Sequence, residues 1–194
     1  MGVRLTQAIK TLARLVRRPL IILVALTVVV SVSAIGYVVV TQRNPFCFAI
    51  TAHGLLQQMT VGDLTKASDT ILIGTVTQVG PSWQTISGWV FTSVTVNTSR
   101  YLKSPMSLVT VQLRIEGGST TCGGLIVEDQ PSFVKGPLVL LFLRMTNYNS
   151  PDSYLAVVGG PQGKYTIENG SAWWGDPSNA VPLDDLIAEI NRNI

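Results

Sequence analysis

An uncharged run of twenty-one residues, 20–40, constrains this chain more than any other feature of its sequence. A helix rises about 1.5 Å per residue, so this run reaches roughly 30 Å, the thickness of the hydrocarbon core of a bilayer. A helix also satisfies its backbone N–H and C=O groups internally, as a lipid environment requires. Pro19 suits the first helical position, where its missing N–H costs nothing. The run therefore predicts a single transmembrane helix.

The charges beside this run predict its orientation. The tail of residues 1–19 carries five basic residues, and no acidic residue precedes Asp63. Positively charged flanks stay on the cytoplasmic side of a membrane. We therefore expect a single-pass plasma-membrane protein with a cytoplasmic N-terminus, whose residues after Arg43 are extracytoplasmic.

A cleaved signal peptide is the alternative, because Val32, Ser33 and Ala34 suit the positions that a signal peptidase reads. Cleavage would release a soluble domain. The apolar run, however, continues to Val40 and exceeds the usual signal-peptide core of roughly 7–15 residues. Its length favours a retained anchor.

Charge and composition describe the exported part. The whole chain has a net charge of +3, but six of its fourteen basic residues lie at or before Arg43. The rest of the chain has eight basic and eleven acidic residues, which gives it a net charge of −3. This balance does not favour nucleic acid as a partner. The low charged fraction of 13%, with many Thr, Ser, Val and Gly residues, is typical of an extracytoplasmic β domain.

Export also bears on the two cysteines and on two sequons. Cys47 and Cys122 would both lie in an oxidising compartment, where one disulfide could close a long loop, and two unpaired thiols are the alternative. Asn97 and Asn169 each begin an N-x-S/T motif, a glycosylation acceptor in organisms that use it.

The pattern of apolar residues divides the exported chain into a connector, residues 41–59, and a domain, residues 60–194. Thr60 and Asp63 form a capping box that opens a short helix, and the spacing of Leu183, Leu186, Ile187 and Ile190 predicts a second helix over residues 184–193. Between them lie seven β-rich runs bounded by turn residues: 70–79, with Gly74 predicting a bulge or bend, then 89–98, 108–115, 125–127, 138–145, 154–158 and 165–167.

These runs predict a mainly β fold. Short strands with one early and one terminal helix fit a small OB-like β-barrel, because closure removes exposed strand edges. A β-sandwich is the alternative. The apolar run 138–143 predicts a central strand buried on both faces.

Several segments fall in an order that resembles a group of uncharacterised exported bacterial and archaeal proteins. They are residues 64–74, 91–92, 101–103, 117–118, 130–133, Gly136 with 140–143, and 159–164. The resemblance implies a small β-barrel outside the cell and assigns no catalytic residue. A more distant similarity of outline, to the netrin-like barrel of metalloproteinase inhibitors, concerns the fold alone, and the cysteine framework of that group is missing.

Catalytic patterns are weak. His53 is the only histidine and lies in the connector, which disfavours a Ser/His/Asp or Cys/His site, and one histidine with two separate cysteines disfavours structural zinc. The densest acidic pairs, 128–129 and 184–185, precede a turn and a helix, where carboxylates have structural roles. The Gly-rich stretch 117–124 matches no phosphate-binding motif and predicts a turn loop. No cofactor or metal is expected.

The four tryptophans, Trp83, Trp89, Trp173 and Trp174, have two interpretations. Core packing is the more common role of Trp, whereas exposed Trp side chains bind sugars or proteins. The adjacent pair Trp173 and Trp174, in a Gly-rich segment, is the first candidate for binding.

We therefore predict a non-catalytic, membrane-anchored interaction domain that binds a protein or an envelope polymer. An enzyme accessory or a hydrolase based on carboxylates is one alternative, and its mark would be a pocket with converging Asp or Glu residues. A secreted inhibitor-like module, released by signal cleavage, is another.

Overall fold

Two β-sheets and two helices make up the part of the chain described by the computed structural model, residues 49–85, 88–104, 106–121, 123–146 and 153–194. The tail of residues 1–19, which we predicted to be cytoplasmic, the predicted transmembrane helix 20–40 and both cysteines lie outside these ranges. Among the described residues, none of the helices combines the length and the apolar character needed to cross a membrane.

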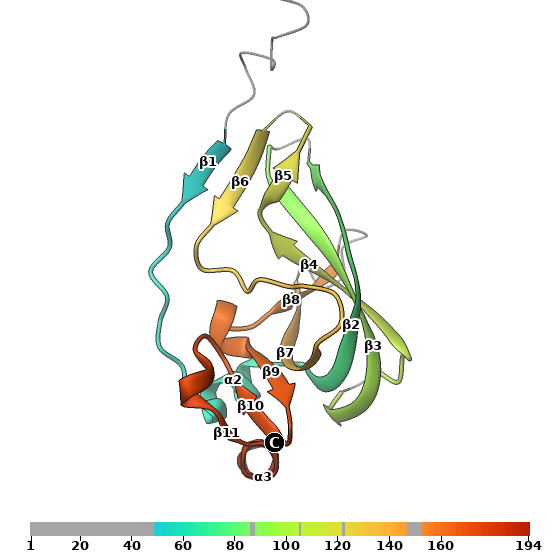
Figure 1. The fold of residues 1–194 in the computed structure, drawn as a ribbon, viewed down its shortest axis with the longest axis vertical. Coiled ribbons are helices and arrows are strands. Elements are labelled where there is room, and N and C mark those ends of the chain that lie inside the picture. The colour runs from blue at the N-terminus through green and yellow to red at the C-terminus, as the bar shows by residue number, and fades with distance from the viewer. Residues whose placement is uncertain (1–48, 86–87, 105, 122, 147–152) are drawn as a thin grey trace, which may run out of the picture. The chain divides into compact units, whose positions relative to one another are not determined.

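The elements follow one another along the chain as Figure 1 labels them. The strands are β1 (Ala49–Ala52), β2 (Thr70–Gln84), β3 (Val90–Lys103), β4 (Thr110–Glu116), β5 (Gly118–Thr120), β6 (Gly123–Val127), β7 (Leu138–Thr146), β8 (Tyr154–Val157), β9 (Lys164–Glu168), β10 (Ser171–Trp173) and β11 (Val181–Pro182). The helices are α2 (Val61–Ala67) and α3 (Leu183–Asn193), with 3₁₀ turns η1 (Gly160–Gly163) and η2 (Pro177–Asn179). The prediction of a mainly β fold is confirmed.

The larger sheet has eight strands in the order β11-β10-β9-β7-β2-β3-β4-β8. The last strand in this order, β8, pairs with two strands: it lies parallel to β4 and antiparallel to β7. The hydrogen-bonded path from β7 through β2, β3, β4 and β8 therefore returns to β7. Strands β9, β10 and β11 extend the sheet on the other side of β7, and Figure 1 shows them beside α3.

Strand β7 separates two hydrophobic cores. Residues 139–143 alternate between them and are all fully buried. One core, with the helices, consists of Leu64, Ile71, Ile73, Leu140, Phe142, Val158, Tyr165, Ile167, Ala172, Leu186 and Ile190. The other, inside the paired circuit, consists of Leu72, Val76, Val94, Val96, Val111, Leu113, Ile115, Val139, Leu141, Leu143 and Leu155. The prediction that 138–143 is a central strand with two buried faces is confirmed, with Leu138 itself half-buried.

Local signals in the sequence correspond to local structure. Thr60 and Asp63 form the predicted capping box: Thr60 Oγ1 accepts from Asp63 N at 3.1 Å, and Asp63 Oδ2 accepts from Thr60 N at 3.0 Å. The β2–β3 register shifts between Ile73 and Gly74, where a Cβ on Gly74 would meet Asn97 O at 2.6 Å. The predicted helix at the C-terminus is α3. Each of these predictions is confirmed.

The Gly-rich stretch was wrongly predicted to be a loop, because residues 118–120 and 123–127 pair as strands β5 and β6. Gly117 and Gly118 have φ of 101° and 136°, a backbone conformation that favours glycine. A Cβ on Gly118 would also collide with Ser82 Oγ and Thr92 Oγ1, so glycine permits β5 to lie close to β2 and β3. The glycines here allow close strand contact.

The segment expected to act as a connector pairs with the domain. Strand β1 lies parallel to β6 in a separate three-stranded sheet, β1-β6-β5. Farther along, the buried Gln162 of η1 accepts from Met59 N at 2.9 Å and donates to Gln57 O at 2.9 Å. Residues 49–59 therefore belong structurally to the β domain.

Candidate functional site

None of the four tryptophans is buried, so the expectation of core tryptophans is wrong. Trp83 and Trp173 are half-buried, while Trp89 and Trp174 are 49% and 39% exposed. Val, Leu and Ile residues fill both cores instead, and Phe142, Tyr165 and Ala172 add to the core beside the helices. The tryptophans occupy strand ends and outward-facing positions, where a large aromatic ring is available to a ligand.

Trp173 and Trp174 line a pocket built on the sheet extension. Strand β9 alternates, with Tyr165 and Ile167 buried against the helices and Lys164 and Thr166 on the opposite face. Trp173 of β10 is directly opposite Thr166 in the ladder, so these side chains share that face.

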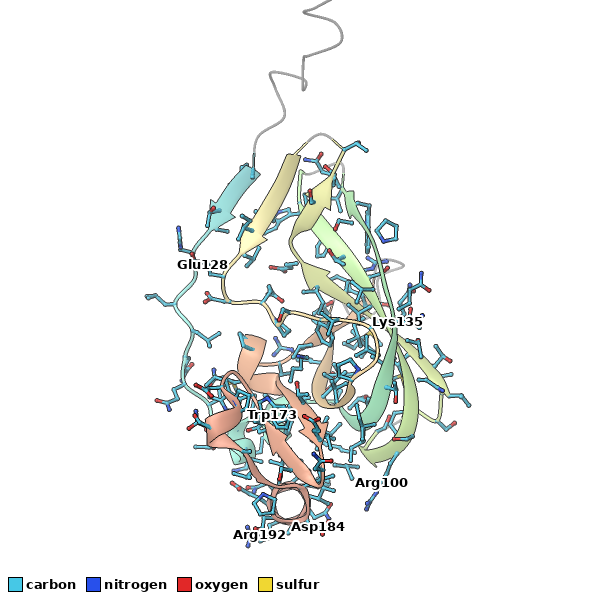
Figure 2. The ribbon with its side chains drawn as sticks, viewed as in Figure 1. Arg100, Glu128, Lys135, Trp173, Asp184 and Arg192 are labelled. Carbon is cyan, nitrogen blue, oxygen red and sulfur yellow. The ribbon has the colours of Figure 1, made fainter. Side chains whose placement is uncertain are left out.

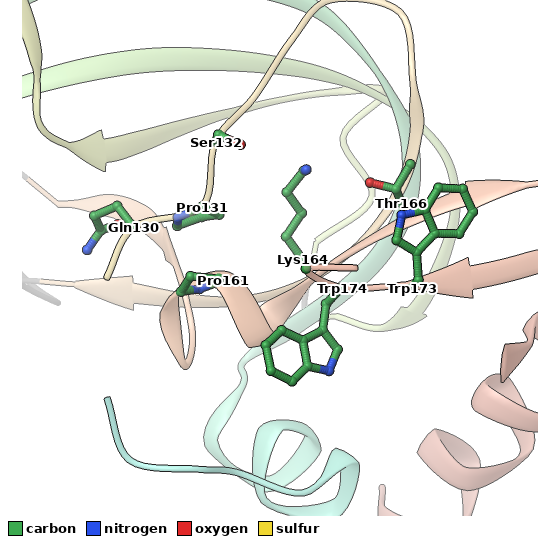
Figure 3. Close-up of a pocket in the computed structure, with 9 residues that line it drawn as sticks. Gln130, Pro131, Ser132, Pro161, Lys164, Thr166, Trp173 and Trp174 are labelled. Carbon is green, nitrogen blue, oxygen red and sulfur yellow. The ribbon is translucent and has the colours of Figure 1, made fainter. Parts of the chain in front are cut away.

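The loop between β6 and β7 supplies the other wall. Pro131 is buried, and with Gln130 and Ser132 it lines the pocket opposite the sheet. In Figure 3 the Lys164 side chain extends between this loop and the indole of Trp173. The cavity has a volume of about 250 Å³, and Pro161, Trp174 and Gly175 complete its lining.

Lys164 is the charged group of this pocket. Its Nζ lies 5.3 Å from the centroid of the Phe133 ring, and within the described residues it makes no hydrogen bond or ion pair. Burial lowers the pKa of this ammonium group. The cation thus has an aromatic neighbour but no counter-anion from the described chain.

The other predicted site residues lie elsewhere. Asn97 is exposed in the middle of β3, and Asn169 is exposed in the two-residue turn from β9 to β10, where its φ is 51° and that of Gly170 is 77°. Such a left-handed Asn-Gly pair is a favoured hairpin turn. Cys47 and Cys122 fall outside the described residues, so their disulfide stays a prediction.

His53 contacts a carboxylate, and neither residue of this pair lines the pocket. His53 Nδ1 lies 2.7 Å from Glu128 Oε2, and both side chains are more than half exposed. The described residues contain no group of three or more His, Cys, Asp or Glu side chains suited to a metal. Figure 2 shows Glu128 near the end of β6 and Asp184 on α3, far apart in this view.

A second aromatic cluster lies on the outer face of β2, β3, β4 and β8. Arg114 Cζ lies 5.7 Å from the Trp83 ring centroid and 5.1 Å from that of Tyr154. Phe91 completes the group, with its ring 6.0 Å from Trp83 and 5.7 Å from Tyr154. Arg114 thus makes cation–π contacts with two aromatic rings of this cluster.

Sequence reasoning identified the two tryptophans but missed their neighbours. Lys164, Thr166, Gln130, Pro131 and Ser132 come from two segments more than thirty positions apart. Only the order of the strands brings them together, and no local spacing signals it. A lysine that alternates with Tyr165 and Ile167 on a short strand was the single available clue.

Comparison of the chain with protein-family models, with curated proteins and with solved structures found no match.

Proposed function

We propose that this chain is a non-catalytic binding protein, anchored by residues 20–40 with its N-terminus in the cytoplasm, whose extracytoplasmic domain binds a cell-envelope polymer or protein. The charge asymmetry around the uncharged run supports the anchor and its orientation. The resemblance to exported β-barrel proteins is part of the same proposal.

The finer fold we propose is an OB-like barrel made of β2, β3, β4, β7 and β8. The closed path of pairings supports it, as does the parallel contact of Leu113 in β4 with Leu155 in β8. The buried residues of one core, inside this path, supply the interior that a small barrel needs.

The observation that carries the function is the pocket of Trp173, Trp174 and Lys164. It combines exposed aromatic surface, hydrogen-bonding side chains and a cation without an ion-pair partner among the described residues in one concave site, which is the usual make-up of a binding site. Its lining, all of it within the described residues, includes no Asp or Glu. This composition favours binding over hydrolysis by paired carboxylates.

Retention on cell envelopes tests this function. Full-length protein in detergent is mixed with envelopes of the source organism, and the bound fraction is measured by sedimentation. We expect Trp174→Ala to lower the bound fraction severalfold, because the variant removes an exposed ring of the pocket.

Trp89→Ala is the matched control. Trp89 is also an exposed tryptophan, but it precedes β3 and does not line the pocket. Equal loss of retention in both variants, or no loss in Trp174→Ala, would contradict the assignment of the pocket as the binding site.

A further inference from the structure

The electrostatics of the pocket define what kind of ligand it accepts. Lys164 lies half-buried on β9 and lines the pocket with Gln130, Pro131 and Ser132, so its charge is partly removed from water. Such a charge is stabilised by an opposite charge. The Phe133 ring, 5.3 Å from Nζ, offers only a weak cation–π contact. An anionic group of a ligand would supply what the described chain does not.

The acidic residues next to the pocket in sequence do not neutralise this lysine. The Asp129 carboxylate lies against Gly54, where an added Cβ would collide with Oδ2. Asp176 Oδ1 accepts from Ser178 N at 2.8 Å and caps η2. The pocket is therefore cationic although the exported chain as a whole is acidic.

The remaining lining defines the body of the ligand. Trp173 and Trp174 provide flat apolar surface, and Gln130, Ser132 and Thr166 provide amide and hydroxyl groups around it. A pyranose ring has matching chemistry, with apolar C–H faces and hydroxyl groups at its edge. A cavity of about 250 Å³ is smaller than the roughly 300–1,000 Å³ of sites for drug-sized ligands, so it fits about one such ring.

We propose that this pocket binds an acidic sugar, a pyranose that carries a carboxylate, as one unit of an extracellular polysaccharide. The carboxylate pairs with Lys164 Nζ, and the ring packs on the tryptophans. This inference rests on the proposed function and specifies its ligand. A short acidic peptide shares the carboxylate but lacks the ring, so it serves as an outcome of the test.

The experiment titrates the full-length protein in detergent with four probes by calorimetry. They are an oligogalacturonate, the same oligosaccharide fully methyl-esterified, a neutral malto-oligosaccharide of equal length, and an oligoglutamate peptide. We expect the oligogalacturonate to bind at least about tenfold more tightly than the esterified and the neutral sugars, since a charge-assisted hydrogen bond has roughly this worth. It should also bind more tightly than the oligoglutamate, which has carboxylates but no ring to pack on the tryptophans. Its affinity should also fall as salt is raised.

Variants identify the cation. Lys164→Met should lower the affinity for oligogalacturonate about tenfold or more, and Lys164→Arg should retain part of it. Arg114→Met is the matched control, because Arg114 is also a cation stacked on aromatic rings but does not line the pocket. Thermal melts check folding, and Trp174→Ala provides a second pocket variant at a more exposed position.

The outcomes separate the two proposals. Equal binding of the acidic, esterified and neutral sugars, or preference for oligoglutamate, would overturn the acidic-sugar assignment while a ligand-binding pocket remained. Loss of binding in Arg114→Met equal to that in Lys164→Met would overturn it as well. If no probe binds but Trp174→Ala still lowers envelope retention, only the ligand class is wrong. If neither assay responds, both proposals fail.

Discussion

Single buried polar residues in this domain differ in how well their hydrogen bonds are satisfied. Gln162, only 2% exposed, uses its amide oxygen and nitrogen to hold Met59 N and Gln57 O. Thr70 is 1% exposed, yet its Oγ1 has no hydrogen-bond partner among the described residues. A buried donor without a partner costs about 1–3 kcal/mol. The first residue therefore stabilises the fold, and the second is a position where stability can be gained.

Replacing this hydroxyl tests the second statement. Thr70→Val keeps the β-branched shape and removes the unpaired group, so we expect about 1 kcal/mol of added stability in urea unfolding of the full chain. Thr65→Val is the control, because buried Thr65 donates its hydroxyl to Val61 O at 2.7 Å and should lose stability. A similar loss of stability in both variants would show that the Thr70 hydroxyl has a hydrogen-bond partner in solution.

Tyr165 predicts a pH dependence. Burial first, and the charge of Glu189 second, raise the pKa of its phenol, which packs against Phe142 in the core beside the helices. The unfolded chain therefore ionises first, near its ordinary pKa of about 10. Stability is complete below that pH and falls as the pH rises toward the folded pKa.

The measurement is the thermal midpoint at pH 8 and at pH 10.5. We expect the thermal midpoint of the wild type to fall more between these two pH values than that of Tyr165→Phe, which has no phenol to ionise. Identical losses in the two proteins would show that the phenol titrates normally in the folded state.

At the scale of elements, β7 is the strand on which the fold depends. It pairs with β2 over residues 138–143, with β9 over residues 138–141 and with β8 over residues 143–146, and it contributes to both cores. A strand that is buried on both faces explains why 139–143 is continuously apolar rather than alternating. The helices α2 and α3 pack with one face of β7, and the interior of the paired circuit packs with its other face. The two cores therefore share this strand.

Paired substitutions test the two-sided burial. Leu140 faces the helices and Leu141 faces the circuit interior, and both are fully buried. Leu140→Ala and Leu141→Ala should each cost about 2–5 kcal/mol. Alanine is preferred to aspartate here because Lys164 is opposite Leu141 in the ladder and would compensate a carboxylate.

Thr95→Ala, on the outer face of β3, is the control and should change stability by less than about 1 kcal/mol. A leucine variant as stable as this control would mean that one face of β7 is exposed in solution.

At the scale of the whole molecule, the predicted anchor decides where the domain acts. With the N-terminus inside, protease added to intact cells should degrade the chain after Arg43 and leave a membrane-bound stub, because the positive flank keeps the tail cytoplasmic. Immunoblots against tags at the two ends measure this. Recovery of the intact domain from the medium would instead support cleavage after Ala34.

The sequence alone determined the features that depend on neighbours along the chain. The capping box of α2, the spacing of Leu186 and Ile190, the Gly74 irregularity and the apolar run of β7 all follow from local backbone and burial preferences. These preferences predict which residues are buried. They do not predict which strands pair with one another in the sheet.

Only the tertiary structure decided the candidate site. Lys164 and Trp173 meet because β9 and β10 pair, and Pro131 joins them because the preceding loop folds over the same face. A Trp in the sequence also does not indicate whether its side chain is buried or exposed, since its large ring packs in cores and binds ligands at surfaces. Strand pairing and the exposure of these rings depend on long-range packing, which local periodicity does not encode, so the cationic aromatic pocket could not be predicted from sequence alone.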